Sequence, residues 1–412
     1  MRNQKTTAPA FLSRGTYGCI FRPGISCKGE RPLTDKYITK IHINDEATVR
    51  EKNIGEKIQQ IKNYEDYYAP ILSDCEVSLS SVSSQEIKKC DILPPDTLTY
   101  DASKVRYVGK NTLLKHLLMK YKSLPAGIVR EIIETYTILL DGFGKLSFTG
   151  IIHFDVKENN IICEDRTGTP IIIDFGLTID VTEIAKNKYT DAFYVYGPDY
   201  GPWCLEIAMI SYGANELTKA DSKDTGYAGF GKGVETVSWL EQTVTKEQID
   251  KVINEFVKSN DVFAELITKN QQEDYRVKQI EHYSKYIGKS WKKMIDELQS
   301  YYKTWDNYGL AVAYLYVIKD LKLEMIMGTF VSYLEGIVLS LPHERPTCDQ
   351  AKSKIKEMFS KVKKTDKKKY QIQLKKQGHN QSEVHKQVWE SIKKGLIVDE
   401  NRNKRVQTAR VI

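Results

Sequence analysis

The chain has 412 residues, of which 41% are hydrophobic, 10% aromatic and 28% charged. This balance is typical of a soluble globular protein with two or three domains or lobes, and it argues against an intrinsically disordered chain. The N-terminal stretch lacks the apolar core of a signal peptide, and no apolar run is long enough to predict a membrane span.

The formal net charge of +7 is concentrated near the C-terminal end. Residues 361–412 hold 15 basic and 5 acidic side chains, a net +10, so the first 360 residues carry a net −3. We expect a basic tail that contacts nucleic acid or acidic surfaces, or that is simply a solvated extension. The seven cysteines form no CxxC pair and no Cys/His cluster, which argues against a zinc site or a disulfide framework and favours a reducing compartment.

Strands are expected at the start of the chain and a helix after them. Residues 9–43 are rich in β-forming residues around two glycines, and residues 76–110 alternate polar and β-branched residues in the same way. Between them the period changes at Asp45, because apolar residues recur at intervals of four and three, which predicts one face of a helix. These residues are Ile54, Ile58 and Ile61.

Helices are expected to dominate from Thr112 onward, with one short exception. The β-like runs at residues 161–163 and 171–173 flank a turn at Gly168, which predicts a hairpin. Residues 207–305 begin with a glycine-rich loop and then become helical. Thr245 followed by Gln248 predicts a capping box at the start of one of these helices.

The loop HFDVKENN at residues 153–160 concentrates the chemistry of the chain. It offers a carboxylate, an ammonium and an amide, and the acidic turn Asp174-Phe175-Gly176 follows after the predicted hairpin. Phosphoryl transfer needs a group that holds the polyphosphate, a hard cation that neutralises it and a group that orients the attacking hydroxyl. The glycine-bearing turn and Lys40, which lies between apolar residues, could hold the phosphates. The sequence therefore contains each part in order.

The ordered set resembles the serine/threonine type of the protein-kinase superfamily over roughly residues 11–358. The resemblance implies an α+β, bilobal protein-kinase-like fold. It places a small β-rich N-lobe in residues 1–110 and a large helical C-lobe in residues 111–360. The C-lobe carries a helical insertion at about residues 207–305, and the basic tail at 361–412 follows it.

The resemblance also implies roles for individual residues, with ATP and Mg²⁺ (or Mn²⁺) as cofactors. Asp155 matches the catalytic base, and Lys157 would neutralise the transferring phosphoryl group. Asn160 and Asp174 would hold the metal ion. The ATP-binding residues would be Ser13, which stands in place of a glycine, Gly15, Gly18, Ile20, Lys40 and Glu51.

Four further residues match positions that support the kinase site. Asp306 would brace the catalytic loop, and His153 would serve as a structural brace within it. Arg345 would pair with Glu206 at the end of the activation segment. The expected partner of Lys40 is Glu51, which shares a helix face with the apolar residues; the alternative is Glu56, which has the more usual spacing.

Phe154 departs from the family pattern, which has an arginine before the catalytic aspartate. In the family that arginine pairs with a phosphorylated activation-loop residue. Since phenylalanine cannot form this pair, we expect activity that does not require activation-loop phosphorylation. The insertion is the second departure: it would cover the substrate face, bind a partner or enlarge the helical lobe.

The motif mix is similar to kinases encoded by large nucleocytoplasmic DNA viruses. This similarity implies action in the cytoplasm of an infected host cell, with or without packaging into virions. Protein substrates are expected, including virion or DNA-associated proteins. Two alternatives stay open: a pseudokinase scaffold and a kinase-like small-molecule phosphotransferase.

Overall fold

The computed structural model describes residues 8–360 apart from residues 16–17, 30–33, 43–44, 94–96, 185–192, 194 and 218–237. Within these residues the contacts divide the chain into two compact units. The first unit combines Met1–Leu113 with Asn160–Thr178, and the second combines Leu114–Asn159 with the described part of Ile179–Ile412. The chain thus passes between the units three times, and each unit is described by itself. The predicted lobe boundary at residue 110 stays a prediction.

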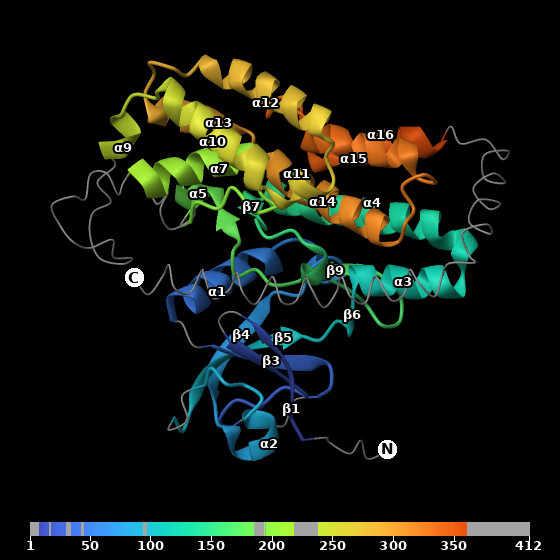
Figure 1. Cartoon of the computed structure of the whole chain (residues 1–412). Coiled ribbons are helices and arrows are strands. Elements are labelled where there is room, and N and C mark those ends of the chain that lie inside the picture. Colours follow the sequence, from blue (N-terminus) through green and yellow to red (C-terminus); the bar gives the residue numbers. More distant parts are fainter. Residues whose placement is uncertain are drawn as a thin grey trace. The chain divides into compact units, whose positions relative to one another are not determined.

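The first unit is built on a five-stranded antiparallel sheet in the order β1-β2-β3-β5-β4 (Figure 1). Gly15 pairs with Gly18 where β1 turns into β2, and Ile20 on β2 pairs with Lys40 on β3. A Cβ atom on Gly18 would overlap the backbone carbonyl of Ile41, so the close approach of β3 requires glycine there. The strands are β1 (Ala10–Gly15), β2 (Gly18–Arg22), β3 (Tyr37–His42), β4 (Ile71–Val77) and β5 (Tyr100–Arg106).

Helix α1 (Asp45–Gln59) packs against β4, beside which it lies in Figure 1. Ile54 and Ile58 are buried on its inner face, as the apolar spacing predicts, whereas Ile61 lies beyond the end of the helix. Gly55 allows the close contact, because a Cβ atom there would lie 2.6 Å from the carbonyl oxygen of Ile71.

The segment between β4 and β5 corrects two predictions. It contains the short helices η2 (Leu79–Ser81) and α2 (Ser84–Ile87) where further strands were expected. The argument against a disulfide framework was also wrong, because disulfides join Cys19 to Cys90 and Cys27 to Cys75. The paired cysteines are 71 and 48 residues apart in sequence and meet through tertiary packing, so no local spacing could have indicated them. The remaining cysteines, all free and buried, are Cys163, Cys204 and Cys348.

A smaller sheet completes the first unit. It has the order β6-β8-β9, formed by β6 (Asn111–Thr112), β8 (Ile161–Cys163) and β9 (Pro170–Ile172). The predicted hairpin is confirmed: β8 and β9 are antiparallel, and Gly168 has the positive φ of +75° that favours glycine in the turn.

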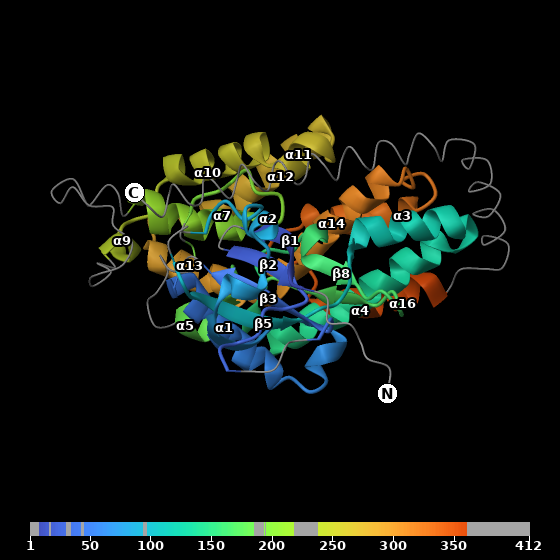
Figure 2. The same cartoon turned by 90° about the horizontal axis from the view of Figure 1, so that it is seen from below.

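The second unit is mainly helical (Figures 1 and 2). Helix α14 is buried along almost its whole length and packs against α4 and α15. A two-stranded pairing of β7 (Ile151–Ile152) with β10 (Ile179–Asp180) brackets the loop that begins at His153. The helices are α3 (Leu113–Ser123), α4 (Ile128–Phe148), α5 (Val181–Ile184), α7 (Leu205–Tyr212), α9 (Ser238–Glu241), α10 (Lys246–Ser259), α11 (Asp261–Glu265), α12 (Lys269–Ser284), α13 (Trp291–Ser300), α14 (Trp305–Asp320), α15 (Gly328–Val338) and α16 (Cys348–Ser360).

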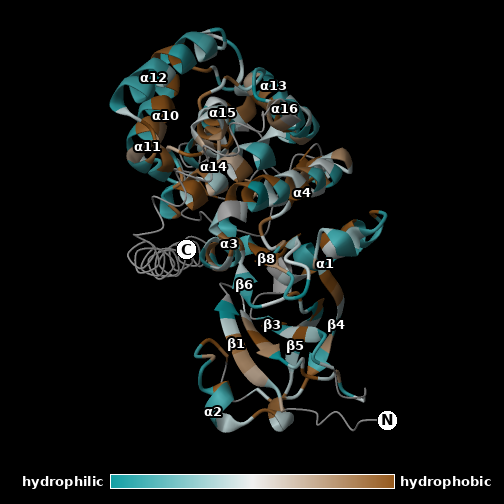
Figure 3. Cartoon of the chain, turned by 90° about the vertical axis from the view of Figure 1, so that its right-hand side faces the viewer, coloured by the Kyte–Doolittle hydropathy of each residue, from teal (hydrophilic) through white to brown (hydrophobic). Residues whose placement is uncertain are grey.

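From residue 238 the insertion forms α9 to α13, and α10 lies beside α12 in Figures 1 and 2. Its first described residues, 207–217, form the rest of α7 and the π-helix η5 (Gly213–Leu217). The predicted capping box at Thr245 and Gln248 is confirmed. Hydrophilic and hydrophobic residues alternate along these helices (Figure 3). Their large aromatic side chains face inward, with at most 3% exposure: Trp239, Tyr275, Tyr283, Tyr286 and Trp291. Most of the predicted glycine-rich loop lies outside the described residues.

The α+β fold class is confirmed, with a strand-rich first unit and a helical second unit in the order that the kinase resemblance implies. A search of the described helices finds none that is both long enough and apolar enough to cross a bilayer.

Candidate active site

Lys40 is the centre of an ion cluster in the first unit. Its Nζ atom lies 2.9 and 2.7 Å from the two carboxylate oxygens of Glu51 and 3.5 Å from Oδ1 of Asp174. Glu51 is buried because it lies three residues before Ile54 on the inner face of α1, whereas Glu56 is exposed. The helix period therefore decides which glutamate meets the lysine.

The charges in this cluster support one another. Burial disfavours the charged form of Lys40, but Glu51 and Asp174 outweigh it, so the pKa of Lys40 is raised above its ordinary value. Burial also raises the pKa of Glu51, and the adjacent Lys40 opposes this shift. Lys40 thus stays cationic at neutral pH.

Asp174 has a left-handed backbone conformation, with φ of +61°, which is uncommon for a residue other than glycine. The following Phe175 is buried and packs edge-on against Tyr68 at 6.3 Å between ring centroids. This anchor leaves the Asp174 side chain 50% exposed. Asn160 is buried. Its backbone carbonyl accepts a hydrogen bond from the N–H of Ile173 at 3.0 Å, which places it close to Asp174.

The described residues contain no group of three or more His, Cys, Asp or Glu side chains that could hold a metal ion. The oxygens of Asp174 and Asn160 nevertheless suit Mg²⁺, which usually takes one or two protein ligands and completes its shell with phosphates and water. Ser13 and Gly15 lie on β1 opposite Ile20 and Gly18, so the structure forms the strand-turn-strand that was expected.

The loop at His153 is held by Asp306 in the second unit. The Asp306 carboxylate accepts hydrogen bonds from the backbone N–H groups of His153 at 2.9 Å and Phe154 at 3.0 Å. Burial raises the pKa of Asp306, and His153 and these bonds oppose the shift. His153 Nδ1 accepts a hydrogen bond from the backbone of Asp155 at 3.3 Å, which suits a brace.

Asp155 is 5% exposed, and both its oxygens have partners. Lys157 Nζ lies 3.2 Å from Oδ2, and the hydroxyl of Tyr200 donates to Oδ1. These two contacts fix the orientation of the carboxylate. The contact with Tyr200 was missed from the sequence, since no motif marks that tyrosine.

Phe154 lies in an aromatic cluster. Its ring centroid is 4.8 Å from that of Trp203 and 5.7 Å from that of Phe193, and Phe193 packs edge-on against Trp305. Trp203 also donates its indole N–H to the Phe154 carbonyl at 2.8 Å. These contacts hold Phe154 at a strained φ of +68°.

Glu206 and Arg345 form a fully buried ion pair, as the resemblance implied. Two guanidinium nitrogens of Arg345 lie 2.6 and 3.1 Å from the Glu206 oxygens. The side chains are 1% and 0% exposed. Burial disfavours the charged form of Arg345, but Glu206 outweighs it and raises the arginine pKa.

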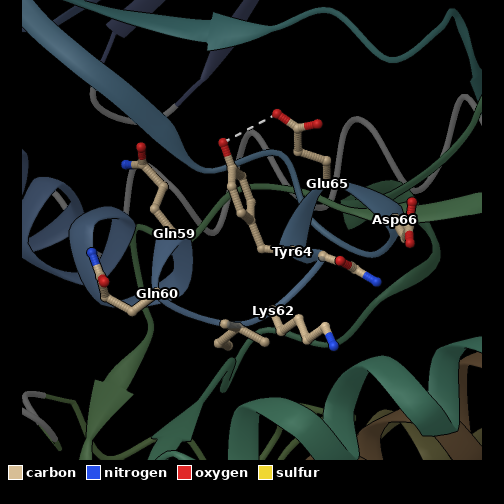
Figure 4. A pocket seen from close by; sticks show the side chains of 8 residues that line it. Gln59, Gln60, Lys62, Tyr64, Glu65 and Asp66 are labelled. Atoms are coloured by element: carbon tan, nitrogen blue, oxygen red, sulfur yellow. Dashed lines mark hydrogen bonds between the residues drawn. The ribbon is translucent and has the colours of Figure 1, made fainter.

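A hollow of about 580 Å³ in the first unit is lined by residues 59–66, just after α1. Figure 4 shows Tyr64 reaching toward Glu65, with 3.4 Å between the hydroxyl and Oε1. None of the residues expected to bind nucleotide lines this hollow, so it carries no part of the proposed chemistry.

Comparisons with known proteins agree with the kinase-like motifs. No family model matches the chain. A stretch of 112 residues is 30% identical to the EKC/KEOPS complex subunit BUD32 of Yarrowia lipolytica. It covers 24% of this chain and 44% of that protein, so the chain matches less than half the length of this relative. The viral origin stays a prediction.

Among solved structures, a Stt7 homolog from Micromonas algae, crystallised and soaked with ATP, is 18% identical to this chain. The similarity has a TM-score of 0.31 and covers 43% of this chain and 53% of that chain.

Proposed function

We propose that the chain is a serine/threonine protein kinase that transfers the γ-phosphoryl group of ATP to protein hydroxyls. The observation that carries the proposal is the Lys40 cluster, in which a lysine with a side chain only 14% exposed is oriented by Glu51 and faces the half-exposed Asp174. A phosphate-binding lysine and an oxygen ligand for the metal are the parts that phosphoryl transfer needs side by side. The similarity to BUD32 supports the same class of chemistry.

In this mechanism the residues of the chain position and neutralise the reacting groups. Lys40 contacts the α and β phosphates, and the glycine turn at Gly15 and Gly18 covers them. Asp155 accepts the hydrogen bond of the attacking hydroxyl and then its proton, while Lys157 neutralises the transferring phosphoryl group. Mg²⁺ or Mn²⁺, when bound, supplies charge neutralisation on the phosphates.

Asn160 and Asp174 are the proposed ligands of that metal ion. Serine/threonine specificity rests on Lys157, two residues after the base, by resemblance. Transfer of labelled phosphate to casein-like proteins rather than to sugars or choline would distinguish a protein kinase from a small-molecule phosphotransferase. Phosphoamino-acid analysis then distinguishes serine and threonine from tyrosine.

We also propose that activity does not require phosphorylation of the activation segment. The aromatic contacts of Phe154 with Phe193 and Trp203 support this, because they anchor the segment without a phosphate. Replacement by alanine of the four hydroxyl residues of the segment should preserve most of the activity. Loss of activity in a folded variant would contradict the proposal. The four residues are Thr178 and Thr182, which are described, and Tyr189 and Thr190, which lie outside the described residues.

The partners and location are proposals of the same kind. The basic residues 361–412, which lie outside the described residues, would contact nucleic acid or acidic surfaces. Deleting them should reduce DNA binding in a salt-dependent way and leave transfer to a peptide unchanged. Work in the cytoplasm of an infected cell or in virions is proposed from the viral resemblance, and detection of the chain in purified virions would test it.

A further inference from the structure

The segment at residues 196–201 is held by the inserted helices. The Tyr196 hydroxyl donates to Oε2 of Glu255 on α10 at 2.7 Å. The backbone N–H of Asp261, the first residue of α11, donates to the carbonyl of Asp199 at 3.3 Å. Gly201 faces Val262, whose side chain would lie 3.1 Å from any Cβ atom there. The insertion thus contacts this segment at several points along its length.

Asn260 makes the most specific of these contacts. It is fully buried and caps α11, because its Oδ1 accepts a hydrogen bond from the backbone of Val262 at 3.1 Å. Its Nδ2 donates to the carbonyls of Pro198 at 3.1 Å and Tyr200 at 3.2 Å. Other capping side chains offer the acceptor but lack the two donors of an amide, so this position couples the helix start to the segment.

Tyr200 connects the segment to the candidate base. It is 6% exposed, and its ring packs edge-on against Trp203 at 5.2 Å between centroids. Its hydroxyl donates to Oδ1 of Asp155, while Lys157 lies against Oδ2. Because the backbone of Tyr200 is fixed by Asn260, its hydroxyl is a rigid partner of the carboxylate.

We propose that the insertion positions the catalytic base: Asn260 fixes the 196–201 segment, and Tyr200 in that segment orients Asp155. The inference rests on the proposed function, since it concerns the base of that reaction. The insertion would therefore order the activation segment. In other members of the kinase family a phosphate paired with an arginine does this. Tyr200 and Asn260 are positioning residues.

Two variants test the proposal by kinetics. Tyr200→Phe removes one hydroxyl and keeps the ring packing. Asn260→Asp keeps the capping oxygen and removes both donors. Tyr200→Phe should lower kcat by roughly 10- to 100-fold, the value of a hydrogen bond to a charged group. Asn260→Asp, which acts only through Tyr200, should lower kcat by up to the same factor. Both variants should leave KM for ATP unchanged. Tyr200→Phe should also move the acidic limb of the pH–rate profile to higher pH, because the lost bond favoured the ionised carboxylate.

Matched controls come from the same insertion. Tyr283→Phe removes the hydroxyl of an equally buried tyrosine on α12, and Ser290→Ala removes the cap of α13. Both should leave kcat and the pH profile unchanged. If Asn260 acts through Tyr200, the double variant Tyr200→Phe/Asn260→Asp should be no more than about threefold slower than Tyr200→Phe alone.

Hydrogen exchange provides a second measurement that does not require turnover. Amides in residues 195–203 should exchange faster in Asn260→Asp than in the wild type, and at the wild-type rate in Ser290→Ala. Unchanged exchange in Asn260→Asp would overturn the proposal that Asn260 fixes the 196–201 segment. If Asn260→Asp fails to fold, Tyr200→Phe still decides the link to the base.

The outcomes separate this inference from the proposed function. An active wild type, an inactive Asp155→Ala variant and a Tyr200→Phe variant with wild-type kcat would overturn only the positioning role. A double variant whose loss of kcat equals the product of the two single-variant losses would also overturn it. A wild type that transfers no phosphate, or an Asp155→Ala variant as active as the wild type, would overturn both.

Discussion

The buried ion pair of Glu206 and Arg345 gives a stability prediction that can be worked from the structure. Both guanidinium–carboxylate contacts are within 3.1 Å, and the side chains are almost inaccessible to solvent. Glu206→Gln removes the negative charge but keeps a similar shape. Arg345 would then be a buried cation without a counter-ion, and burial strongly disfavours such a charge.

The expected loss follows from the cost of breaking a buried pair. Removing one partner destabilises a protein by about 3–5 kcal/mol. We expect the lower end, about 3 kcal/mol, because the glutamine oxygen of Glu206→Gln can still accept one hydrogen bond. This is a large fraction of the roughly 5–15 kcal/mol that stabilises a typical fold.

Urea denaturation of the second unit, followed by tryptophan fluorescence, measures this loss. The control is a double variant, Glu206→Leu/Arg345→Met, in which apolar side chains replace both charges. It should be more stable than Glu206→Gln, because replacing both partners removes the uncompensated charge. A loss below about 1 kcal/mol in Glu206→Gln, or a double variant less stable than it, would refute the reasoning.

Three further predictions follow from the described contacts. Burial, and after it the adjacent Lys40, lowers the pKa of His42 from 6.5 to about 3, so the imidazole is neutral in the folded protein. The contribution of His42 to the free energy of unfolding should be fully present above pH 6.5 and should fall as the pH drops toward 3, by about 2 kcal/mol at pH 5. In His42→Gln, melting curves recorded across this pH range should no longer show this dependence. Replacing Cys19 and Cys90 by alanine should lower the free energy of unfolding by about 4 kcal/mol, because the disulfide closes a long loop. In thermal denaturation, a reductant should then lower the melting temperature of this variant less than that of the wild type. Asp306→Asn should cost about 1–3 kcal/mol, measured by denaturation, because the amide has only one acceptor oxygen and leaves one of the two backbone N–H donors without an acceptor.

The sequence was most informative where the chemistry is local. Lys40, Asp155 and Asp174 lie in short motifs whose spacing is set by a strand, a turn and a hairpin. The choice of Glu51 over Glu56 followed from the helix period, which places Glu51 on the same face as Ile54. Such features depend on a few neighbouring residues, so the sequence contains most of the information that determines them.

Long-range contacts could not be predicted in the same way. Tyr200 meets Asp155 across 45 residues, and Asn260 meets Tyr200 across 60. Neither lies in a recognisable motif, and an asparagine before a helix predicts only a cap. The disulfide of Cys19 with Cys90 likewise depends on how β2 packs against the segment after α2. These pairings follow from tertiary packing, and local sequence patterns do not predict it.

The aromatic environment of Phe154 shows an intermediate case. The sequence shows that phenylalanine stands where the family has an arginine, and it therefore predicts that the site cannot form the arginine–phosphate pair. What takes its place was not visible, because Phe193 and Trp203 come from distant positions and meet Phe154 only in the folded chain. The structure therefore gives a physical basis for a regulatory prediction that began from one substitution.

The central claim is tested most directly by the rate of transfer of the γ-phosphoryl group from ATP to a protein substrate in the presence of Mg²⁺. The wild type should phosphorylate serine or threonine. Asp155→Ala and Asp174→Ala should each lose at least about 100-fold in rate while remaining folded, because they remove the proposed base and the proposed metal ligand. Equal rates in the wild type and both variants would contradict the account.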